Sequence, residues 1–184
     1  MIVVGIAGHF GAGKDTVAQR LVLRHGFVRV GFADCLKHEV AAKLRGTLLA
    51  YAGERGTVIH NPDAAIHTLL WDERTPMTRK LLQEWGTELR RTEDPEYWVA
   101  AWRNAASKYP RVVVPDVRFI NEALAITERG GRLVRVERPG YHGDGHASET
   151  SLSSWTGWAR IFINDGTVDA LHDAVDQWWF GTAH

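Results

Sequence analysis

The feature that most constrains this chain is a glycine-rich segment that lies between an apolar run and an amphipathic one. Residues 8–16 read Gly-His-Phe-Gly-Ala-Gly-Lys-Asp-Thr and directly follow the apolar run at residues 2–7. Glycines let backbone N–H groups turn inward around a polyphosphate, and a helix that begins near Asp15 adds the partial positive charge of its N-terminus. The order of strand, loop and helix therefore predicts a phosphate-binding loop, in which Lys14 reaches the β and γ phosphate oxygens.

One position departs from the usual pattern of such a loop, in which serine or threonine follows the lysine. Here Asp15 follows Lys14, and Thr16 comes next. The hydroxyl group normally ligates Mg²⁺. We therefore expect either Asp15, directly or through a water molecule, or Thr16 to hold the ion, with ATP and Mg²⁺ as the cofactors.

Length and composition set broader limits. The 184 residues suit one α/β domain that spans residues 1–184. Lysine plus arginine and aspartate plus glutamate number 22 each, so no excess of positive charge favours a nucleic-acid or membrane partner. The single cysteine, Cys35, excludes an internal disulfide framework and fits a reducing compartment. With neither a leader pattern nor an apolar run near the roughly 20 residues of a membrane span, we expect a cytoplasmic protein.

Strand and helix patterns alternate along the chain. We expect strands at residues 2–7, 27–32, 111–114, 133–137 and 161–163, and helices at about 15–25, 33–44, 76–91, 95–107, 119–129 and 167–179. This alternation predicts a parallel sheet with helices on both faces. Residues 45–75, which contain three glycines and Pro62, are expected to form an irregular insertion with broken helices.

Polar residues follow several of the predicted strands. Asp116 and Arg118 come after the strand at 111–114, Arg138 after the next, and residues 164–167 after the last. Ligands of open parallel sheets bind beyond the carboxyl ends of the strands. We therefore expect these residues to share a catalytic site with the glycine-rich loop, although Asp116 could instead cap a helix and Arg118 could be solvated or paired structurally.

The helix predicted at 76–91 has a glycine, Gly86, in its interior. Such a glycine costs about 1 kcal/mol relative to alanine, so we expect another part of the chain to approach its backbone closely. Arg79 and Gln83 are four residues apart on one face and could recognise a monoester phosphate and a base edge. The alternative is a buried helix with a packing glycine.

The chain has eight tryptophans. Core or interface packing is the expected role of Trp98, Trp102 and Trp85, with base stacking by one of them as the alternative. A patch at residues 178–180 is one option for self-association into a homo-oligomer.

Residues 138–149 have the glycines of a hinged lid. On closure, Arg138 could meet the transferred phosphoryl group. His142, Asp144 and His146 could suggest a zinc site, but ordinary loop histidines are the favoured interpretation.

Four segments resemble the phage-type deoxynucleoside monophosphate kinases, a family of P-loop kinases. They are Leu-Leu-Gln-Glu-Trp-Gly-Thr-Glu at 81–88, Asp-Val-Arg-Phe-Ile-Asn-Glu-Ala at 116–123, His-x-Ser-Glu at 146–149 and Asn-Asp-Gly-Thr at 164–167. The Gly-Lys-Asp-Thr form of the loop at 13–16 also looks like that family. The poorest match is residues 45–75.

The resemblance implies an α/β, nucleoside monophosphate kinase-like P-loop fold with an inserted acceptor-binding region and a lid. It implies ATP-dependent phosphorylation of deoxynucleoside monophosphates (dNMPs) to diphosphates. The implied catalytic residues are Lys14, Arg138 and Asp116. The implied ATP-binding residues are Gly11, Ala12, Gly13, Lys14, Asp15, Thr16, Arg138, Asn164, Gly166 and Thr167. The implied dNMP-binding residues are Lys37, Arg79, Gln83, Trp85, Asp116, Arg118 and Glu122.

Two other functions stay open on the sequence. One is another small P-loop kinase, acting on dephospho-coenzyme A or a phosphorylated metabolite. The other is a regulatory module that binds ATP without transferring phosphate. A second site with two arginines, Arg79 and Arg118, is a feature that a mere ATP sensor would not require.

Overall fold

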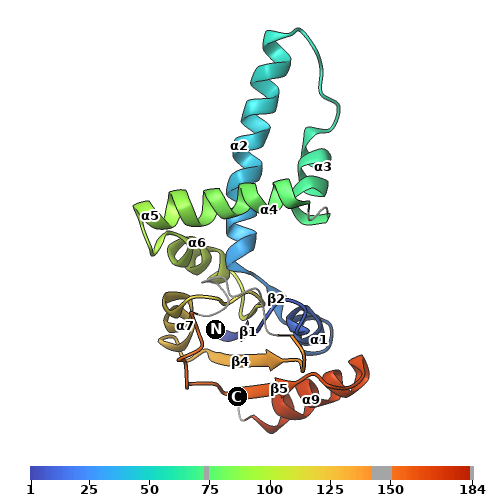
Figure 1. Cartoon of the computed structure of the whole chain (residues 1–184), viewed down its shortest axis with the longest axis vertical. Coiled ribbons are helices and arrows are strands. Elements are labelled where there is room, and N and C mark those ends of the chain that lie inside the picture. Colours follow the sequence, from blue (N-terminus) through green and yellow to red (C-terminus); the bar gives the residue numbers. More distant parts are fainter. Residues whose placement is uncertain (73–74, 142–150, 183–184) are drawn as a thin grey trace. The chain divides into compact units, whose positions relative to one another are not determined.

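The computed structural model describes residues 1–72, 75–141 and 151–182. The chain forms two compact units, and Figure 1 labels most of their helices and strands. We call Met1–Phe32 with Trp102–His184 the phosphate-loop unit and Ala33–Ala101 the helical unit. Each unit is described by itself.

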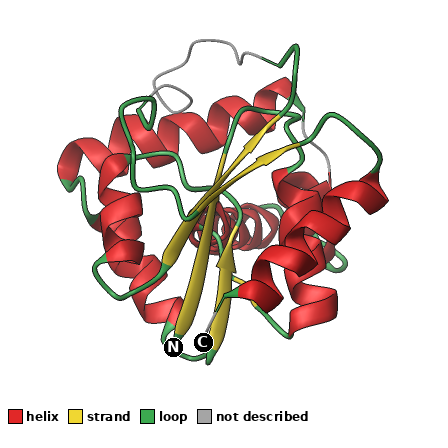
Figure 2. Cartoon of the chain, turned by 90° about the horizontal axis from the view of Figure 1, so that it is seen from below, coloured by secondary structure: helices red, strands yellow, loops and turns green. Residues whose placement is uncertain are grey.

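The phosphate-loop unit is built on a five-stranded sheet (Figure 2). Its strands are β1 (Ile2–Ala7), β2 (Val28–Arg29), β3 (Arg111–Val114), β4 (Arg132–Glu137) and β5 (Arg160–Ile163). The order is β2-β3-β1-β4-β5 and every pairing is parallel, which confirms the predicted parallel sheet. Strand β1 pairs on both sides, with Val4 opposite both Val113 and Arg132. A central parallel strand is covered on both faces, which explains the continuous apolar run at residues 2–7.

Among the described residues, the helices that pack on this sheet include α1 (Lys14–His25), α7 (Ile120–Thr127) and α9 (Val168–Gly181). Alternate residues of β1 face opposite sides. Val4 and Ile6 are fully buried in a core with residues of α1 and α9. Gly5 faces α7, where an added Cβ would lie 2.7 Å from Ile126 Cδ1. Both faces of β1 are therefore covered, as a buried parallel sheet requires.

The helical unit contains no strand among its described residues. Its elements are α2 (Phe32–Glu54), α3 (Pro62–His67), the π-helical segment η1 (Thr68–Asp72), α4 (Pro76–Gln83), the π-helical segment η2 (Glu84–Arg90), α5 (Arg91–Glu93) and the first part of α6 (Tyr97–Ala106). One small cluster of buried residues consists of Val40, Ile66 and Leu70, with partly buried apolar side chains around them. Ala52, Trp98 and Val99 are also buried. Thr75 caps α4 by accepting a hydrogen bond from the Thr78 N–H, and Pro76 begins the helix as expected.

The helix predicted at 76–91 consists of α4, η2 and α5, and two other elements differ in length from the sequence prediction. The helix expected to end near Leu44 continues to Glu54, so Gly46 and Gly53 lie inside it. The alanines and leucines around these glycines are strong helix formers, which can offset a glycine cost of about 1 kcal/mol each. The strand expected at 27–32 is restricted to Val28–Arg29.

The described helices include none that is long and apolar enough to cross a membrane.

Candidate active site

The glycine-rich loop adopts backbone conformations that only glycine tolerates well. Gly8, Gly11 and Gly13 have φ angles of 145°, 76° and 107°, in the left-handed region. An added Cβ would lie 2.3 Å from the Val136 carbonyl oxygen at Gly8 and 2.6 Å from the Asn164 side-chain nitrogen at Gly13. These glycines are therefore required both for backbone conformation and for space.

Lys14 lies across this loop. Its Nζ donates hydrogen bonds to the carbonyl oxygens of Gly8 and His9, each at 2.7 Å. Helix α1 begins at Lys14, and the residue before it, Gly13, has no side chain that could cap the helix. The first N–H groups of a helix have no partner within the helix and form a partial positive charge. The loop and the helix end thus have the donors and the charge to bind a polyphosphate.

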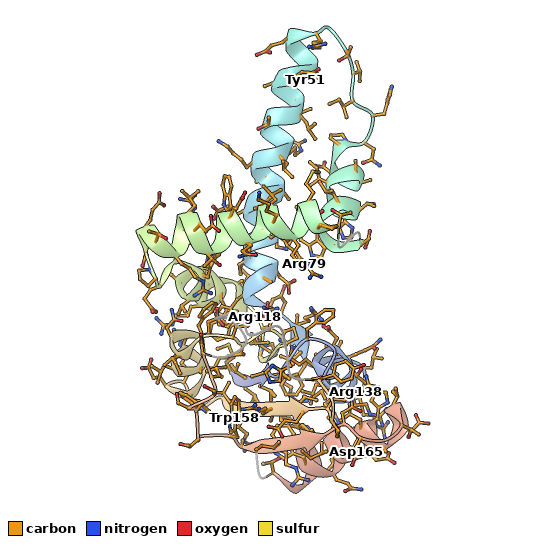
Figure 3. The ribbon with its side chains drawn as sticks, viewed as in Figure 1. Tyr51, Arg79, Arg118, Arg138, Trp158 and Asp165 are labelled. Atoms are coloured by element: carbon orange, nitrogen blue, oxygen red, sulfur yellow. The ribbon has the colours of Figure 1, made fainter. Side chains whose placement is uncertain are left out.

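Two side chains from neighbouring strand ends approach the loop. Asn164, directly after β5, donates a hydrogen bond from Nδ2 to the Ala12 carbonyl oxygen at 2.8 Å. Arg138, directly after β4, lies with Nη1 3.5 Å from the Gly11 carbonyl oxygen and with its guanidinium 4.7 Å from the centre of the Tyr141 ring. The structure therefore brings the predicted residues Arg138 and Asn164 to the loop; Figure 3 labels Arg138 and Asp165 on these strand ends.

Asp116 lies at the end of β3, as a Walker B-type acid is expected to do. Its Oδ1 accepts a hydrogen bond from the Phe32 N–H at 3.0 Å. Both carboxylate oxygens lie 2.8 Å from the position that a Cβ on Gly31 would occupy. The carboxylate is half-buried and held against the backbone of residues 31–32.

The turn after Asp116 is held by Glu122, which is 1% exposed. Glu122 Oε2 accepts hydrogen bonds from the N–H groups of Arg118 and Phe119, at 2.7 and 3.1 Å. This is the acidic half of a capping box at the start of α7. The resemblance implied that Glu122 contacts the acceptor. In the structure, the Glu122 carboxylate holds the backbone N–H of Arg118, whose side chain is exposed.

The two residues proposed as Mg²⁺ ligands lie in the first turn of α1. Asp15 Oδ1 accepts a hydrogen bond from Arg29 Nη1 at 2.8 Å, and the two side chains are 65% and 45% exposed. Such exposed ion pairs contribute little stability, so exchanging this contact for one with Mg²⁺ would cost Asp15 little free energy. Thr16 is half-buried. Within the described residues, no group of three or more His, Cys, Asp or Glu side chains could by itself hold a metal ion.

In the helical unit, two predicted acceptor residues share a pocket on α4. The pocket has a volume of about 310 Å³ and is lined by Pro76, Arg79, Lys80 and Gln83. The sequence prediction missed Lys80, although it directly follows Arg79. Lys80 lies 3.6 Å from Glu84 in an exposed i,i+4 ion pair. The pocket combines two cations with an amide, a suitable set for a phosphate monoester.

The other predicted acceptor residues of the helical unit lie elsewhere in it. The Trp85 indole N–H donates to Glu39 Oε1 at 2.9 Å. The Lys37 ammonium lies 5.5 Å from the centre of the Trp71 ring. Trp85 and Lys37 therefore contact Glu39 and Trp71 of the same unit, two residues that the sequence analysis did not identify.

Glu39 on α2 joins η2 and α6 of the helical unit, and the sequence analysis did not identify it. Besides Trp85, its carboxylate accepts hydrogen bonds from Arg90 Nε at 2.8 Å and from the Tyr97 hydroxyl at 2.6 Å. Burial raises the pKa of this carboxyl group, but the hydrogen bonds from Tyr97, Trp85 and Arg90 outweigh it and leave the pKa below its ordinary value. No local signal could have found Glu39, because its partners are 46 to 58 residues away in sequence.

The close approach expected at Gly86 is confirmed. A Cβ there would lie 2.8 Å from Leu36 Cδ2. The Gly86 carbonyl oxygen also accepts a hydrogen bond from the Trp98 indole N–H at 2.9 Å. Trp98 and Trp102 are both buried, which confirms the packing interpretation. Gly86 lies in the π-helical segment η2, where the α-helical hydrogen-bond pattern is interrupted. Its carbonyl oxygen can therefore accept a hydrogen bond from the Trp98 side chain.

Several predicted features have other outcomes. Residues 142–149 of the expected lid, with His142, Asp144 and His146, lie outside the described residues. Thr167 accepts a hydrogen bond from the Ala170 N–H and caps α9, and the neighbouring Gly166 is exposed. Of the residues suggested for self-association, Trp179 is 4% exposed and packs on Phe27, whereas Phe180 is 70% exposed.

The sequence matches a known family. A profile of the deoxynucleotide monophosphate kinase family matches residues 39–175. A candidate deoxynucleotide monophosphate kinase of Acanthamoeba polyphaga mimivirus is 33% identical over 197 aligned positions, which cover 95% of this chain and 94% of the viral protein. The chain belongs to the deoxynucleotide monophosphate kinase family. It is therefore a phosphotransferase, and the resemblance seen in its motifs is confirmed.

Solved structures give more distant similarities. A sugar kinase from a Janibacter species is 13% identical, with 97% of this chain and 94% of that chain covered and a TM-score of 0.46. The APS kinase of Mycobacterium tuberculosis is 17% identical, with 97% and 96% covered and a TM-score of 0.43. The strand order, the glycine-rich loop and the family of this chain indicate a P-loop kinase fold.

Proposed function

We propose that this kinase transfers the γ-phosphoryl group of ATP to deoxynucleoside monophosphates. The glycine loop supports the first half of this proposal, the binding of ATP as phosphate donor. Three of its glycines have left-handed backbone conformations, and Lys14 begins a helix that has no side-chain cap. Family membership supports the acceptor half. A role in supplying precursors for viral DNA synthesis, in the cytoplasm of a host cell, would follow from this activity.

On the donor side, Lys14 and the loop N–H groups would hold the ATP phosphates. Arg138, which already lies over Gly11, would neutralise charge that develops on the transferred group. Asp15 and Thr16 offer oxygen donors that suit Mg²⁺, which when bound would neutralise the phosphate oxygens. These assignments use only side chains of the phosphate-loop unit, so they do not depend on the helical unit.

On the acceptor side, Arg79, Lys80 and Gln83 would bind the monophosphate and base within one pocket. Lys37 and Trp85 are further candidates from the helical unit. The family resemblance also implies Asp116, Arg118 and Glu122 of the phosphate-loop unit as acceptor residues. A nucleoside monophosphate is largely a dianion at pH 7, so its oxygen is already a nucleophile and no strong general base is required. The residues must instead position two polyanions and neutralise their charge.

A coupled assay for ADP formation tests the proposal. The protein is supplied with ATP, Mg²⁺ and each deoxy- and ribonucleoside monophosphate in turn, and with dephospho-coenzyme A for comparison. Turnover is expected with deoxynucleotides. Saturable ATP binding without turnover on any acceptor would instead favour a regulatory module, and turnover on dephospho-coenzyme A alone would favour the other kinase class.

Replacing Lys14 by alanine should lower kcat about 10²- to 10³-fold, because a preorganised positive charge at the transferred group is lost. The matched control is Lys108→Ala, an exposed lysine of the same unit that should keep wild-type activity. Full activity in a folded Lys14→Ala protein would reject the role assigned to the loop lysine.

The acceptor assignment has its own test. Arg79→Ala and Arg118→Ala should each raise the KM for the dNMP by roughly tenfold, as expected for one lost charged hydrogen bond, and change the KM for ATP less. The exposed Arg129 on the same unit as Arg118 provides a control variant, Arg129→Ala. An effect confined to the KM for ATP would move the substituted arginine to the donor site.

A further inference from the structure

Asn164 makes a contact that a residue bordering only the adenine base would not need. Its Nδ2 donates to the carbonyl oxygen of Ala12, within the glycine loop, at 2.8 Å. Its own N–H donates to the Glu137 carbonyl oxygen at 2.7 Å, which fixes the backbone of Asn164 at the end of β4. The side chain therefore reaches the loop from a position anchored to the sheet.

The contact restrains one particular peptide group. The Ala12 carbonyl and the Gly13 N–H belong to the same planar peptide unit, and the described chain contains no cis peptide bond. In a trans peptide the C=O and N–H point in opposite directions. A hydrogen bond that holds the Ala12 oxygen toward Asn164 consequently turns the Gly13 N–H away from Asn164.

Gly13 is matched to this arrangement. Its φ of 107° is strained for any other residue, and a Cβ would lie 2.6 Å from Asn164 Nδ2. Gly13 is also the residue that precedes α1, where donors to a phosphate are expected. Gly13 therefore leaves the space that the Asn164 side chain occupies, although the two residues are 151 positions apart in sequence.

We propose that Asn164 is a positioning residue that sets the Ala12–Gly13 peptide for binding of a triphosphate, whatever base the triphosphate carries. The proposal rests on the donor half of the proposed function. It differs from the role that the family resemblance implied, in which residues 164–167 border the adenine. A peptide that must reorient on binding costs affinity, and a preorganised one does not.

The two roles predict different ligand dependence, which calorimetric titration can measure. The probes are ATP, GTP and inorganic tripolyphosphate, which has no base. Asn164→Ala should weaken the binding of all three by a similar factor, roughly tenfold for one lost hydrogen bond. Asn164→Asp keeps the shape but replaces the donor by a negative charge facing the Ala12 oxygen, and should weaken all three by roughly a hundredfold.

The control is Asn104→Ala, an exposed asparagine on α6 in the same unit, which should bind all three probes like the wild type. In the kinase assay, Asn164→Ala should raise the KM for ATP and leave the KM for the dNMP unchanged. Because Asn164→Asp is nearly isosteric, it provides the comparison if the alanine variant does not fold.

Two outcomes would overturn the proposal. Loss of ATP affinity with unchanged tripolyphosphate affinity would assign the amide to the base. A lower melting temperature with unchanged affinity for every probe would make Asn164 only a packing residue. A wild-type protein that binds none of the probes would reject the donor half of the proposed function instead, and one that binds them but transfers no phosphate would reject the kinase activity while the binding comparison still decides the role of Asn164.

Discussion

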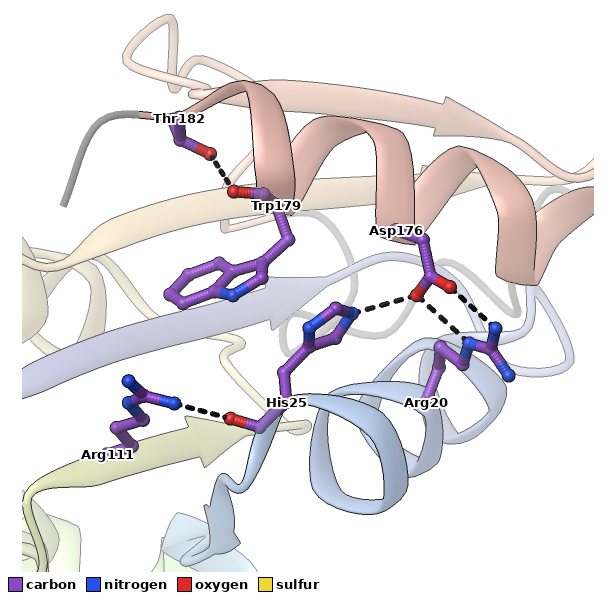
Figure 4. A network of polar contacts seen from close by, with 6 residues as sticks. All are labelled: Arg20, His25, Arg111, Asp176, Trp179 and Thr182. Atoms are coloured by element: carbon purple, nitrogen blue, oxygen red, sulfur yellow. Dashed lines mark hydrogen bonds and ion pairs between the residues drawn. The ribbon is translucent and has the colours of Figure 1, made fainter.

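Asp176 in the phosphate-loop unit and Glu39 in the helical unit are partly buried carboxylates that each join elements distant in sequence, and the packing around the two differs. In the phosphate-loop unit, Asp176 on α9 accepts two hydrogen bonds from Arg20 and contacts His25 Nε2 at 2.8 Å, which ties α9 to α1 (Figure 4). In the helical unit, Glu39 accepts from Trp85, Arg90 and Tyr97.

The difference lies in what else holds each unit. Helices α1 and α9 also share a large apolar core with a hydrogen-bonded sheet, including Leu21 and Val175. The helical unit has no sheet within its described residues, and its apolar cluster around Val40, Ile66 and Leu70 is smaller than the core on the sheet. A small core contributes little hydrophobic free energy. We infer that the stability of the helical unit depends more on Glu39 than that of the phosphate-loop unit depends on Asp176.

The largest effect is expected from Glu39→Ala. The substitution leaves the Tyr97 hydroxyl, the Trp85 indole and the Arg90 guanidinium without their shared acceptor, and should lower the free energy of unfolding by about 2–3 kcal/mol. Urea denaturation followed by circular dichroism measures it. Glu54→Ala, at the exposed end of the same helix, should stay within about 0.5 kcal/mol of the wild type. If Asp176→Ala costs more than Glu39→Ala, the comparison between the units is wrong.

An intermediate effect is expected from acid on Asp176. The hydrogen bond from Arg20 outweighs burial, and with the contact of His25 it lowers the pKa of Asp176 from 3.8 to about 2. A carboxyl group whose pKa is lower in the folded state stabilises the fold above its unfolded pKa, and this contribution is lost as the pH falls. Between about pH 4 and pH 2 the wild type should therefore lose about 1–2 kcal/mol more than Asp176→Asn, after allowance for solvent screening.

Unfolding free energies of the two proteins at several pH values test this expectation. Asp173→Asn, an exposed position on the same helix, serves as the control and should follow the wild type. Parallel curves for the wild type and Asp176→Asn would show that the ion pair contributes nothing in the native state.

The smallest effects come from two glycines of the helical unit. Alanine at Gly86 meets Leu36 Cδ2 at 2.8 Å, whereas nothing lies within 4 Å of a Cβ at Gly46. Gly86→Ala should destabilise by about 1 kcal/mol, since only the end of a leucine side chain must move, and Gly46→Ala should stabilise by about 0.5–1 kcal/mol through helix propensity. Thermal melts of both variants measure the difference. Equal shifts would contradict the close approach of α2 to η2.

Much of the phosphate-loop unit could be predicted from the sequence. The loop at residues 8–16, α1 with Gly26 at its end, and the parallel strands all follow from local pattern, because glycine conformation, helix capping and strand burial act over a few residues. The convergence of residues after β1, β4 and β5 also follows, since parallel strands end at one edge of their sheet. Family motifs added the class of acceptor.

The contacts between residues far apart in sequence became evident only in the folded structure. The sequence suggested Trp85 as a ligand residue but contains no sign that Glu39 accepts its N–H, or that Asn164 holds the Ala12 carbonyl. It also placed the end of α2 ten residues early, because glycine weakens a helix locally while the flanking residues decide whether the helix continues. Local preferences are encoded in neighbouring residues, whereas a hydrogen-bond partner 46 or 152 positions away is fixed only when the chain is packed.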